Sequence, residues 1–362
     1  MTFKLEGDIA ILDGTNTRAS RRRVIENQLK EKMILHYKLI WIESICTLPV
    51  IIEKNILKTK VTSPDYKYWE DSEKAAEDFR NRIREYEKVY ESVSKVLDGE
   101  EASFIKIINQ GSQIVMRNVR GYIESKIFSY LINLHTGDRP IYFTRHGESE
   151  FNKKGLIGGD SSLSNLGEKY ADNLGEFFKN ESSSWRELSE GPMVYCSTLK
   201  RAIQTAEQVS FVNTPIVMKS LDEINCGLRD ALSYEEIKDK FPDEHEERSR
   251  DKLNYRYPRG ESYMDVIQRI EPMIYELERR KGPVIIVGHQ GMIRCLYGYF
   301  ACVPIENIPT LDIPIHKVIK FIPEAYGFSE KRFSIDPETK IVTSIDLTKI
   351  GKYPDQLCHI PG

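Results

Sequence analysis

The feature that most constrains the fold is a regular alternation of short apolar segments with longer helical patterns. Beyond residue 140 the apolar segments are 141–144, 193–196, 215–218 and 283–288, with helical patterns between them at 164–179, 199–209 and 263–281. Such alternation is typical of an α/β sheet with helices on both faces, a doubly wound sheet. In these sheets ligands bind beyond the carboxyl ends of the strands, so the residues that follow each strand are the candidates for a site.

The strongest domain boundary is Gly137-Asp138-Arg139-Pro140, because Gly and Pro interrupt regular structure. Before it we expect strands at 8–12, 37–45 and 103–108, and helices at 18–32, 72–90 and 115–134. A chain of 362 residues is long enough for two domains of ordinary size. We therefore predict one α/β domain over residues 1–138, a second over 139–343, and a C-terminal tail over 344–362.

Composition excludes several classes of partner. The net charge of −3 gives no global positive field for nucleic acid or an anionic membrane. The first ten residues lack the apolar core of a signal peptide, and every apolar run is too short to span a bilayer. The 6 cysteines form neither CxxC pairs nor zinc spacings, which indicates reduced thiols and a cytoplasmic location.

Three of the predicted strands are followed by residues that suit phosphate chemistry. They are Arg145 and His146 after the strand at 141–144, Arg201 in the helix after 193–196, and His289 after 283–288. Ser197 is expected to cap that helix, which would place Arg201 near its phosphate-attracting N-terminus. Because the carboxyl ends of parallel strands meet at one edge, we expect both histidines and both arginines at one rim.

A neutral imidazole can attack phosphorus directly and form a covalent phosphoenzyme that water then hydrolyses. Free histidine has a pKa of about 6.5, and neighbouring arginines would favour its neutral form further. Arg145 and Arg201 would also bind the transferring phosphoryl group. Glu223, which follows the strand at 215–218, would supply the proton that the leaving oxygen needs. This chemistry requires no metal ion.

Each of these residues also has an ordinary structural interpretation. A single histidine after an apolar strand is usually structural, and an acidic residue in a loop, such as Glu223, is usually only solvated. Two histidines and two arginines at matching strand ends favour a functional site over coincidence.

Several motifs in the second domain resemble a known family. They are Arg145-His146-Gly147-Glu148 with Asn152, Ile157-Gly158-Gly159-Asp160-Ser161, Lys200-Arg201-Ala202, and Tyr255-Arg256-Tyr257-Pro258. With them, residues 139–343 resemble the bisphosphatase domain of the 6-phosphofructo-2-kinase/fructose-2,6-bisphosphatase family. This domain has a phosphoglycerate-mutase-like fold and belongs to the histidine phosphatase superfamily.

The resemblance implies hydrolysis of fructose-2,6-bisphosphate to fructose-6-phosphate and phosphate, without a cofactor. It implies that His146 becomes phosphorylated, that Glu223 donates a proton, and that Arg145, Arg201, Asn152 and His289 hold the phosphoryl group. It further implies a set of contacts to the sugar and its second phosphate: Gly158, Tyr234, Arg248, Lys252, Tyr263, Gln290 and Arg294. Without the resemblance, the Arg248 and Lys252 pair would read as a solvated surface.

The first domain resembles the second half of the kinase domain of the same family, a partial P-loop-kinase-like α/β domain. The matching segments are Leu12-Asp13-Gly14-Thr15, Ser63-Pro64-Asp65-Tyr66, and Arg82 with Tyr86. The resemblance implies that the kinase-related positions are Asp13, Thr15, Lys60, Arg82 and Tyr86.

The phosphate-binding loop of such kinases has the pattern GxxxxGK[ST], which occurs nowhere in the sequence. We therefore expect kinase activity to be absent, with ATP and magnesium relevant only if such a loop exists upstream. The first domain would be a truncated product, or a structural remnant that forms a homodimer.

Two other functions stay open at this point. A phosphoglycerate mutase or a broad histidine phosphatase would share His146, Arg145, Arg201 and His289. A regulatory subunit that binds sugar phosphates without catalysis would account for the incomplete kinase domain.

Overall fold

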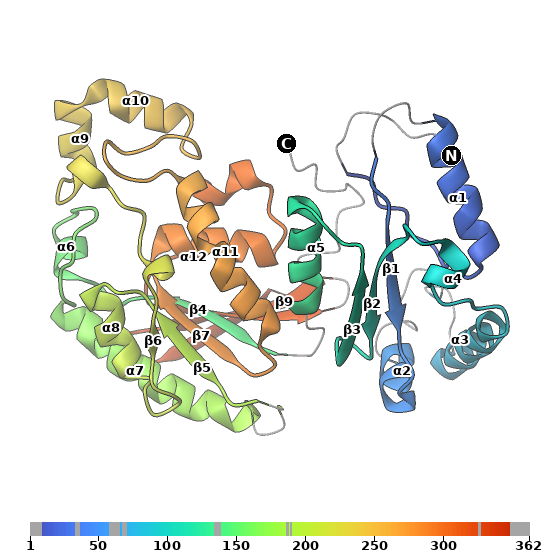
Figure 1. The fold of residues 1–362 in the computed structure, drawn as a ribbon. Coiled ribbons are helices and arrows are strands. Elements are labelled where there is room, and N and C mark those ends of the chain that lie inside the picture. Colours follow the sequence, from blue (N-terminus) through green and yellow to red (C-terminus); the bar gives the residue numbers. More distant parts are fainter. Residues whose placement is uncertain are drawn as a thin grey trace. The chain divides into compact units, whose positions relative to one another are not determined.

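The computed structural model describes residues 9–32, 37–57, 66, 71–133, 139–185, 188, 190–324 and 327–347. The chain divides into two compact units, which separate between Leu134 and His135 (Figure 1). Among the helices of the described residues, none has both the length and the apolar character needed to cross a membrane.

A seven-stranded mixed sheet forms the centre of the second unit, in the order β10-β9-β8-β4-β7-β5-β6. Its strands are β4 (Ile141–Arg145), β5 (Met193–Cys196), β6 (Ile216–Val217), β7 (Val284–Gly288), β8 (Lys317–Glu324), β9 (Gly327–Ile335) and β10 (Val342–Leu347). Strands β4, β7, β5 and β6 are parallel, whereas β8, β9 and β10 are antiparallel additions. The predicted α/β sheet of the phosphoglycerate-mutase type is confirmed.

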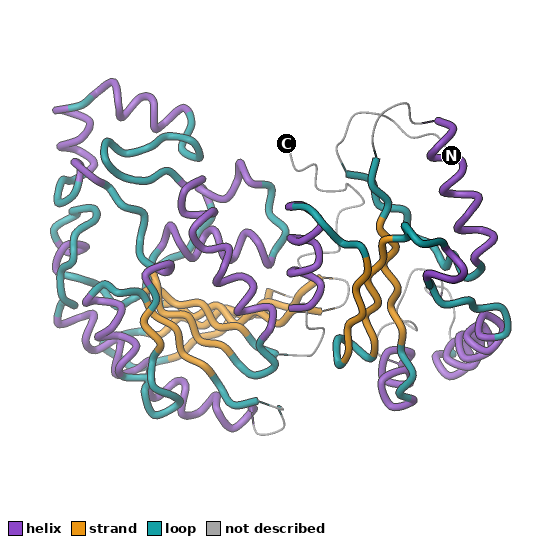
Figure 2. The backbone as a smooth tube through the Cα atoms, viewed as in Figure 1, coloured by secondary structure: helices purple, strands orange, loops and turns teal. Residues whose placement is uncertain are grey.

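Helices cover both faces of this sheet (Figures 1 and 2). Alternate residues of β4 point to opposite faces, so Phe143 joins the core beneath α11 and α12, while Tyr142 joins the core beneath α7 and α8. The helices are α6 (Glu150–Lys153), α7 (Asn165–Glu181), α8 (Lys200–Glu207), α9 (Tyr234–Lys240), α10 (Pro242–Arg250), α11 (Tyr263–Arg279) and α12 (Gln290–Phe300). Short 3-10 helices lie at η3 (Ser182–Trp185), η4 (Lys219–Leu221), η5 (Gly227–Arg229) and η6 (Ile305–Thr310).

The predicted tail from residue 344 is wrong at its start. Residues 342–347 form β10, which pairs with β9 from Val342 opposite Ile335 to Leu347 opposite Glu330. The backbone groups of residues 344–347 are thus paired in the sheet ladder. The remainder of the predicted tail, 348–362, lies outside the described residues.

The first unit contains a three-stranded sheet in the order β1-β2-β3. Its strands are β1 (Ile40–Ile45), β2 (Ser103–Ile108) and β3 (Gln113–Arg117), of which β1 and β2 are parallel and β3 is antiparallel to β2. The helices are α1 (Ala19–Lys32), α2 (Pro49–Asn55), α3 (Ser72–Glu87), α4 (Lys95–Asp98) and α5 (Tyr122–Asn133). A buried ion pair joins α1 to α4, since Arg22 Nε lies 2.6 Å from Asp98 Oδ1.

Two predictions for the first unit are wrong. Residues 9–12 form no strand, and Ile11 is 88% exposed, so the apolar run there lacks a paired neighbour. The helix predicted over 115–134 begins only at Tyr122, because Val115 belongs to β3. Asn118 and Gly121 separate the two elements with φ of 52° and 113°, backbone angles that a helix does not accept.

Candidate active site

The two predicted site histidines lie side by side at the carboxyl ends of β4 and β7. These strands are in parallel register, with Arg145 opposite Gly288, and the His146 N–H donates to the Gly288 carbonyl at 3.0 Å. His289 then occupies the position just before α12, where its side chain makes no capping hydrogen bond. The ring centroids of His146 and His289 are 4.9 Å apart with an interplanar angle of 55°.

The hydrogen bonds of His146 define which ring nitrogen is free to react. Nδ1 lies 2.6 Å from the Gly147 carbonyl oxygen, which can only accept, so Nδ1 carries the proton. Nε2 accepts from Arg201 Nε at 3.1 Å. Burial, followed by the charges of Arg201 and Arg145, holds the pKa of His146 well below its usual value. His146 therefore presents an unprotonated Nε2, the form that a nucleophile needs.

Both predicted arginines lie at this rim, and each is anchored by a backbone carbonyl. Arg201 Nη1 donates to Gly159 O at 2.8 Å, and Arg145 Nη1 donates to Ile313 O at 3.1 Å. The buried Arg145 Nε has no hydrogen-bond partner among the described residues. The guanidinium groups thus keep donor capacity for an anion beside His146.

His289 is fully buried, and its two nitrogens have different surroundings. Nε2 lies 2.6 Å from the Ser197 hydroxyl oxygen, whereas Nδ1 has no partner within the described part of the chain. Burial, followed by the nearby His146, Arg201 and Arg145 side chains, lowers the pKa of His289 well below the usual value. Ser197 was expected to cap the following helix, but α8 begins at Lys200 with Leu199 at the cap position, so that prediction is wrong.

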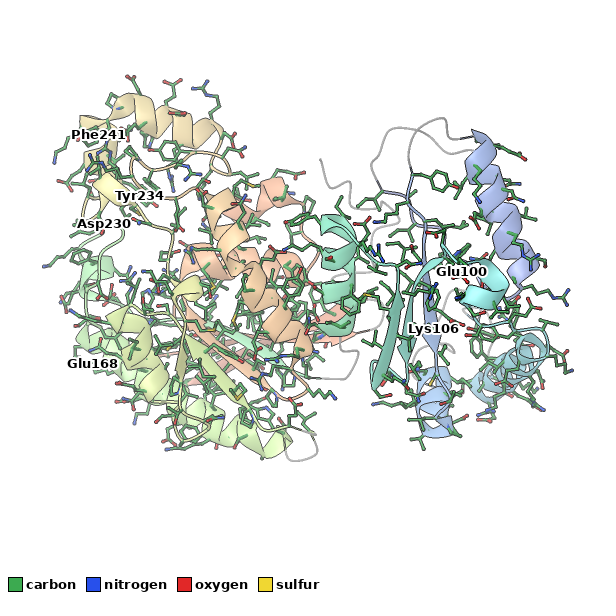
Figure 3. All side chains as sticks on the ribbon, in the orientation of Figure 1. Glu100, Lys106, Glu168, Asp230, Tyr234 and Phe241 are labelled. Atoms are coloured by element: carbon green, nitrogen blue, oxygen red, sulfur yellow. The ribbon has the colours of Figure 1, made fainter. Side chains whose placement is uncertain are left out.

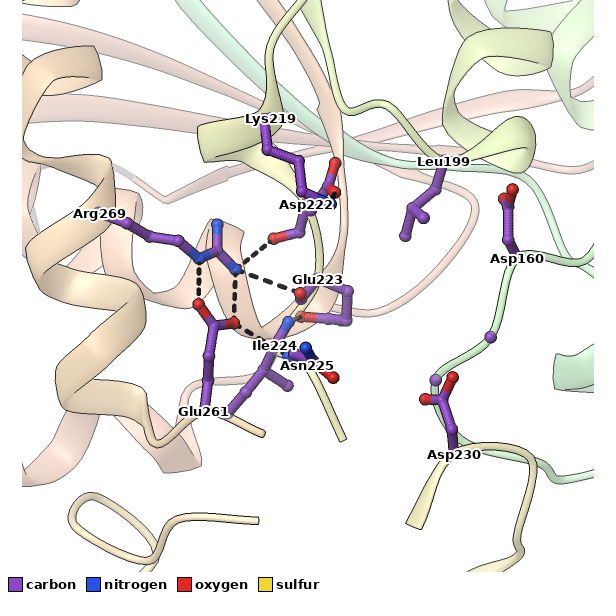
Figure 4. A pocket seen from close by; sticks show the side chains of 12 residues that line it. Asp160, Leu199, Lys219, Asp222, Glu223, Ile224, Asn225, Asp230, Glu261 and Arg269 are labelled. Atoms are coloured by element: carbon purple, nitrogen blue, oxygen red, sulfur yellow. Dashed lines mark hydrogen bonds and ion pairs between the residues drawn. The ribbon is translucent and has the colours of Figure 1, made fainter. Parts of the chain in front are cut away.

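Glu223 is held at the edge of the same site by backbone donors. Its carboxylate accepts from Gly291 N at 3.0 and 3.2 Å, in the first turn of α12, and from Ile224 N at 3.0 Å. The carboxyl group lines a cavity of about 330 Å³ (Figure 4). Gly159, whose carbonyl oxygen accepts from Arg201, lines the same cavity. The predicted proton donor thus contacts Gly291, two residues after His289, although neither histidine lines this cavity.

Arg269, which sequence reasoning missed, organises the loop before Glu223. It donates to the carbonyls of Ser220 and Asp222 at 2.7 Å each. Figure 4 shows its bond to Asp222 and its ion pair with Glu261, at 2.8 Å. The available signal was a cation within the apolar pattern of the helix at 263–281.

Two further predicted site residues, Asn152 and Gly158, have roles in the local fold. The side-chain Oδ1 of Asn152 accepts from Ser149 N at 3.1 Å in the capping box of α6, so the structure uses this atom for the fold. Gly158 lines the cavity with a φ of 68°, and a Cβ there would lie 1.8 Å from Asp230 Oδ1. The positive φ and this close contact both favour glycine at that position.

A second group of cations, Arg248, Lys252 and Arg294, forms what we call the cationic cluster. The pKa of Lys252 is lowered to about 8 by burial and then by the positive charges of Arg294 and Arg248. Two arginines close enough to lower the pKa of Lys252 make a site that favours an anionic ligand.

Neighbouring side chains and carbonyls hold the cationic cluster in place. Arg248 lies over the Tyr234 ring at 4.9 Å and donates to its hydroxyl at 3.2 Å (Figure 3 labels Tyr234). Arg294 Nη1 donates to the Tyr263 hydroxyl at 2.9 Å. Lys252 Nζ donates to Pro309 O at 2.9 Å. Gln290, the first residue of α12, follows directly after His289.

The kinase-related positions have simpler surroundings. Asp13 and Thr15 are exposed in the segment before α1, and Tyr86 is 44% exposed on α3. Arg82 donates to the Tyr66 hydroxyl at 3.2 Å. Lys60 lies outside the described residues.

Comparison with known proteins finds a matching family for each unit. Residues 141–336 match the histidine phosphatase superfamily (branch 1), and residues 2–138 match 6-phosphofructo-2-kinase. Relatives named 6-phosphofructo-2-kinase/fructose-2,6-bisphosphatase are 42% identical in Caenorhabditis elegans, 43% in Arabidopsis thaliana and 45% in Aquarana catesbeiana. The matches cover 92%, 91% and 89% of this chain, and 70%, 43% and 66% of the respective relatives.

The predicted resemblance is therefore confirmed for both domains, although most of these relatives are considerably longer than the part that the chain matches. The chain belongs to the 6-phosphofructo-2-kinase/fructose-2,6-bisphosphatase family and carries a histidine phosphatase domain.

Proposed function

We propose that the chain hydrolyses the 2-phosphate of fructose-2,6-bisphosphate through a phosphohistidine at His146. The observation that carries this proposal is the pairing of an unprotonated, buried His146 with a separate cationic cluster in the same unit. A substrate with two phosphates needs both. The names of the relatives support the same substrate.

In the first step His146 Nε2 attacks the phosphorus of the 2-phosphate. The N–P bond forms as the bond between phosphorus and the sugar oxygen breaks, and the Glu223 carboxyl group gives that oxygen a proton. Arg145 and Arg201 bind the charge that develops on the phosphoryl oxygens. Fructose-6-phosphate leaves with both bonding electrons on its oxygen.

In the second step water attacks the phosphorus of the phosphohistidine. The Glu223 carboxylate takes a proton from the water, the N–P bond breaks, and its electron pair returns to His146 Nε2. The backbone N–H groups of Gly291 and Ile224 donate to the Glu223 oxygens and hold the carboxyl group in position for both proton transfers.

The cationic cluster distinguishes this substrate from a monophosphate. Arg248, Lys252 and Arg294 would hold the 6-phosphate while the 2-phosphate reacts, and a charge-assisted contact contributes about 1.5–3 kcal/mol. A phosphoglycerate mutase or a broad phosphatase would share the histidines but has no evident use for this cluster.

The test compares phosphate release from fructose-2,6-bisphosphate and from 3-phosphoglycerate at equal enzyme concentration. We expect a kcat/KM at least 100-fold higher for the bisphosphate. Equal or reversed preference would contradict the assignment, and tight binding of the bisphosphate without any release would favour a regulatory subunit.

We also propose that a polypeptide of these 362 residues does not phosphorylate fructose-6-phosphate, since its sequence contains no phosphate loop of the pattern GxxxxGK[ST]. The purified chain with ATP, magnesium and fructose-6-phosphate should yield no bisphosphate. The phosphatase must be inactivated by His146→Ala in this assay, so that any product would accumulate and be seen.

A further inference from the structure

Ser197 lies directly after β5, is fully buried, and has two polar contacts that determine where its proton points. Its hydroxyl oxygen lies 2.6 Å from His289 Nε2. The Leu199 N–H donates to the same oxygen at 3.2 Å. A hydroxyl has one proton to donate and two lone pairs that accept.

The Leu199 amide can only donate, so one lone pair of Ser197 is occupied. If His289 Nε2 also carried a proton, the Ser197 hydroxyl would receive two donors. Its own proton would then have no acceptor among the described residues, in a place that water does not reach. A buried donor without an acceptor is unfavourable. That arrangement would leave two buried groups unsatisfied, the Ser197 hydroxyl proton and the His289 Nδ1. If Ser197 instead donates to an unprotonated Nε2, only Nδ1 is left without a partner, so this second arrangement is favoured.

A neutral imidazole carries one N–H, so the proton of His289 must then lie on Nδ1. Nδ1 is the buried nitrogen that has no partner in the described structure, and the His289 ring is 4.9 Å from the ring of the nucleophile. The opposite tautomer would turn a lone pair toward the anionic phosphoryl group, which is repulsive.

We propose that Ser197 is a positioning residue that fixes His289 in the Nδ1–H tautomer, so that His289 donates a hydrogen bond to the transferring phosphoryl group. Its role in catalysis rests on the proposed function. In this arrangement His289 keeps its proton through both steps, and Glu223 alone exchanges a proton with the leaving oxygen and the attacking water.

The direct test is nuclear magnetic resonance of the full chain labelled with 15N-histidine, without substrate. Long-range 1H–15N correlations distinguish the two tautomers, and the spectrum of His289→Asn identifies the His289 signals among the 7 histidines. We expect a protonated Nδ1 and an unprotonated Nε2 in the wild type. A protonated Nε2 or an imidazolium at neutral pH would overturn the proposal, whether or not any variant folds.

Two substitutions extend the test to catalysis. Ser197→Ala should give a mixture of His289 tautomers and lower kcat about 10- to 100-fold, with KM changed less than about threefold, because one phosphoryl donor is weakened. Ser197→Thr retains the hydroxyl and should restore both the tautomer and most of the rate. An unchanged tautomer in Ser197→Ala would refute the assignment. A wild type that is inactive on the bisphosphate yet shows the Nδ1–H tautomer would contradict only the proposed substrate.

Discussion

Both units of the chain contain a sheet with parallel strands and helices, but they differ in how completely these strands are buried. In the second unit, residues 141–144 of β4 are all buried, and the parallel strands β4, β7 and β5 are followed directly by His146, His289 and Ser197. In the first unit, Ile42 of β1 is 53% exposed and Met116 of β3 is 47% exposed. Strands covered on both faces place functional side chains in a dry, fixed environment, and partly covered strands do not.

The same difference appears in the candidate functional residues. His146 is 3% exposed and Tyr86, a kinase-related position, is 44% exposed. Burial is what lowers the pKa of His146 and strengthens the contacts of its arginines. We therefore expect the chemistry of this polypeptide to depend on the second unit, and each prediction below tests that contrast.

The largest effect is expected from removing the nucleophile. His146→Ala should lower phosphate release from fructose-2,6-bisphosphate by about 10⁴-fold or more, because the proposed acceptor of the phosphoryl group is lost. The matched variant in the first unit, Asp13→Asn, should retain the wild-type rate. Steady-state phosphate release measures the rate of both variants. An equal loss of activity in the two would contradict the claim that the chemistry depends on the second unit.

The next effect concerns the proton that Glu223 exchanges. Glu223→Gln keeps the shape but removes the acid, and kcat should fall by about 10²–10⁴-fold. Asp230→Asn, a second carboxylate that lines the same cavity, should change kcat less than about tenfold. If the two variants were equally impaired, the effect would belong to the charge of the cavity and not to a proton donor.

A smaller, pH-dependent effect is expected at the cationic cluster. Lys252 has a pKa of about 8, so it is charged below that pH and loses its charge as the pH rises through 8. KM for the bisphosphate should rise over this range, and Lys252→Met should raise KM about 10- to 100-fold at pH 7 while removing this dependence. Measurement of KM from pH 7 to 9 for both proteins checks the prediction, and a dependence that persists in Lys252→Met would contradict it.

The smallest effect concerns acid. The pKa values of His146 and His289 lie well below 6.5, so both remain neutral where an ordinary histidine becomes charged. The kcat/KM should therefore change less than about twofold between pH 7.5 and 6.5. Below a pH of about 6.5 these two histidines bind protons in the unfolded chain but remain neutral in the folded protein. The free energy of unfolding should therefore decrease as the pH is lowered through this range. Denaturation at several pH values tests this, and unchanged stability would count against the lowered pKa values.

The sequence was most informative where strands are continuous and buried. β2 and β5 have the predicted bounds, and the residues after β4, β5 and β7 were identified because a short apolar run followed by His or Arg is easy to recognise. The antiparallel strands β8–β10 were missed, since their mixed polar and apolar residues give no comparable run. The break between β3 and α5 was missed because it depends on the backbone angles of Asn118 and Gly121.

The site shows the same limit. Residue type and strand position indicated His146, His289, Arg145 and Arg201, but the supporting contacts join segments far apart in the chain. Arg269 contacts the loop at Ser220. Ser197 contacts His289, although the two residues are 92 positions apart in the sequence. Sequence patterns without an alignment do not reveal these pairings. They also do not reveal that the Asn152 side chain takes part in a helix cap.

The central claim is that the phosphoryl group passes through His146. The most direct measurement mixes the protein with fructose-2,6-bisphosphate labelled at the 2-phosphate, quenches within milliseconds, and maps the labelled residue. We expect a transient label that is stable in base and labile in acid, on the peptide that contains His146, and no label on His146→Ala. Rapid release of labelled phosphate with His146 never labelled would contradict the account.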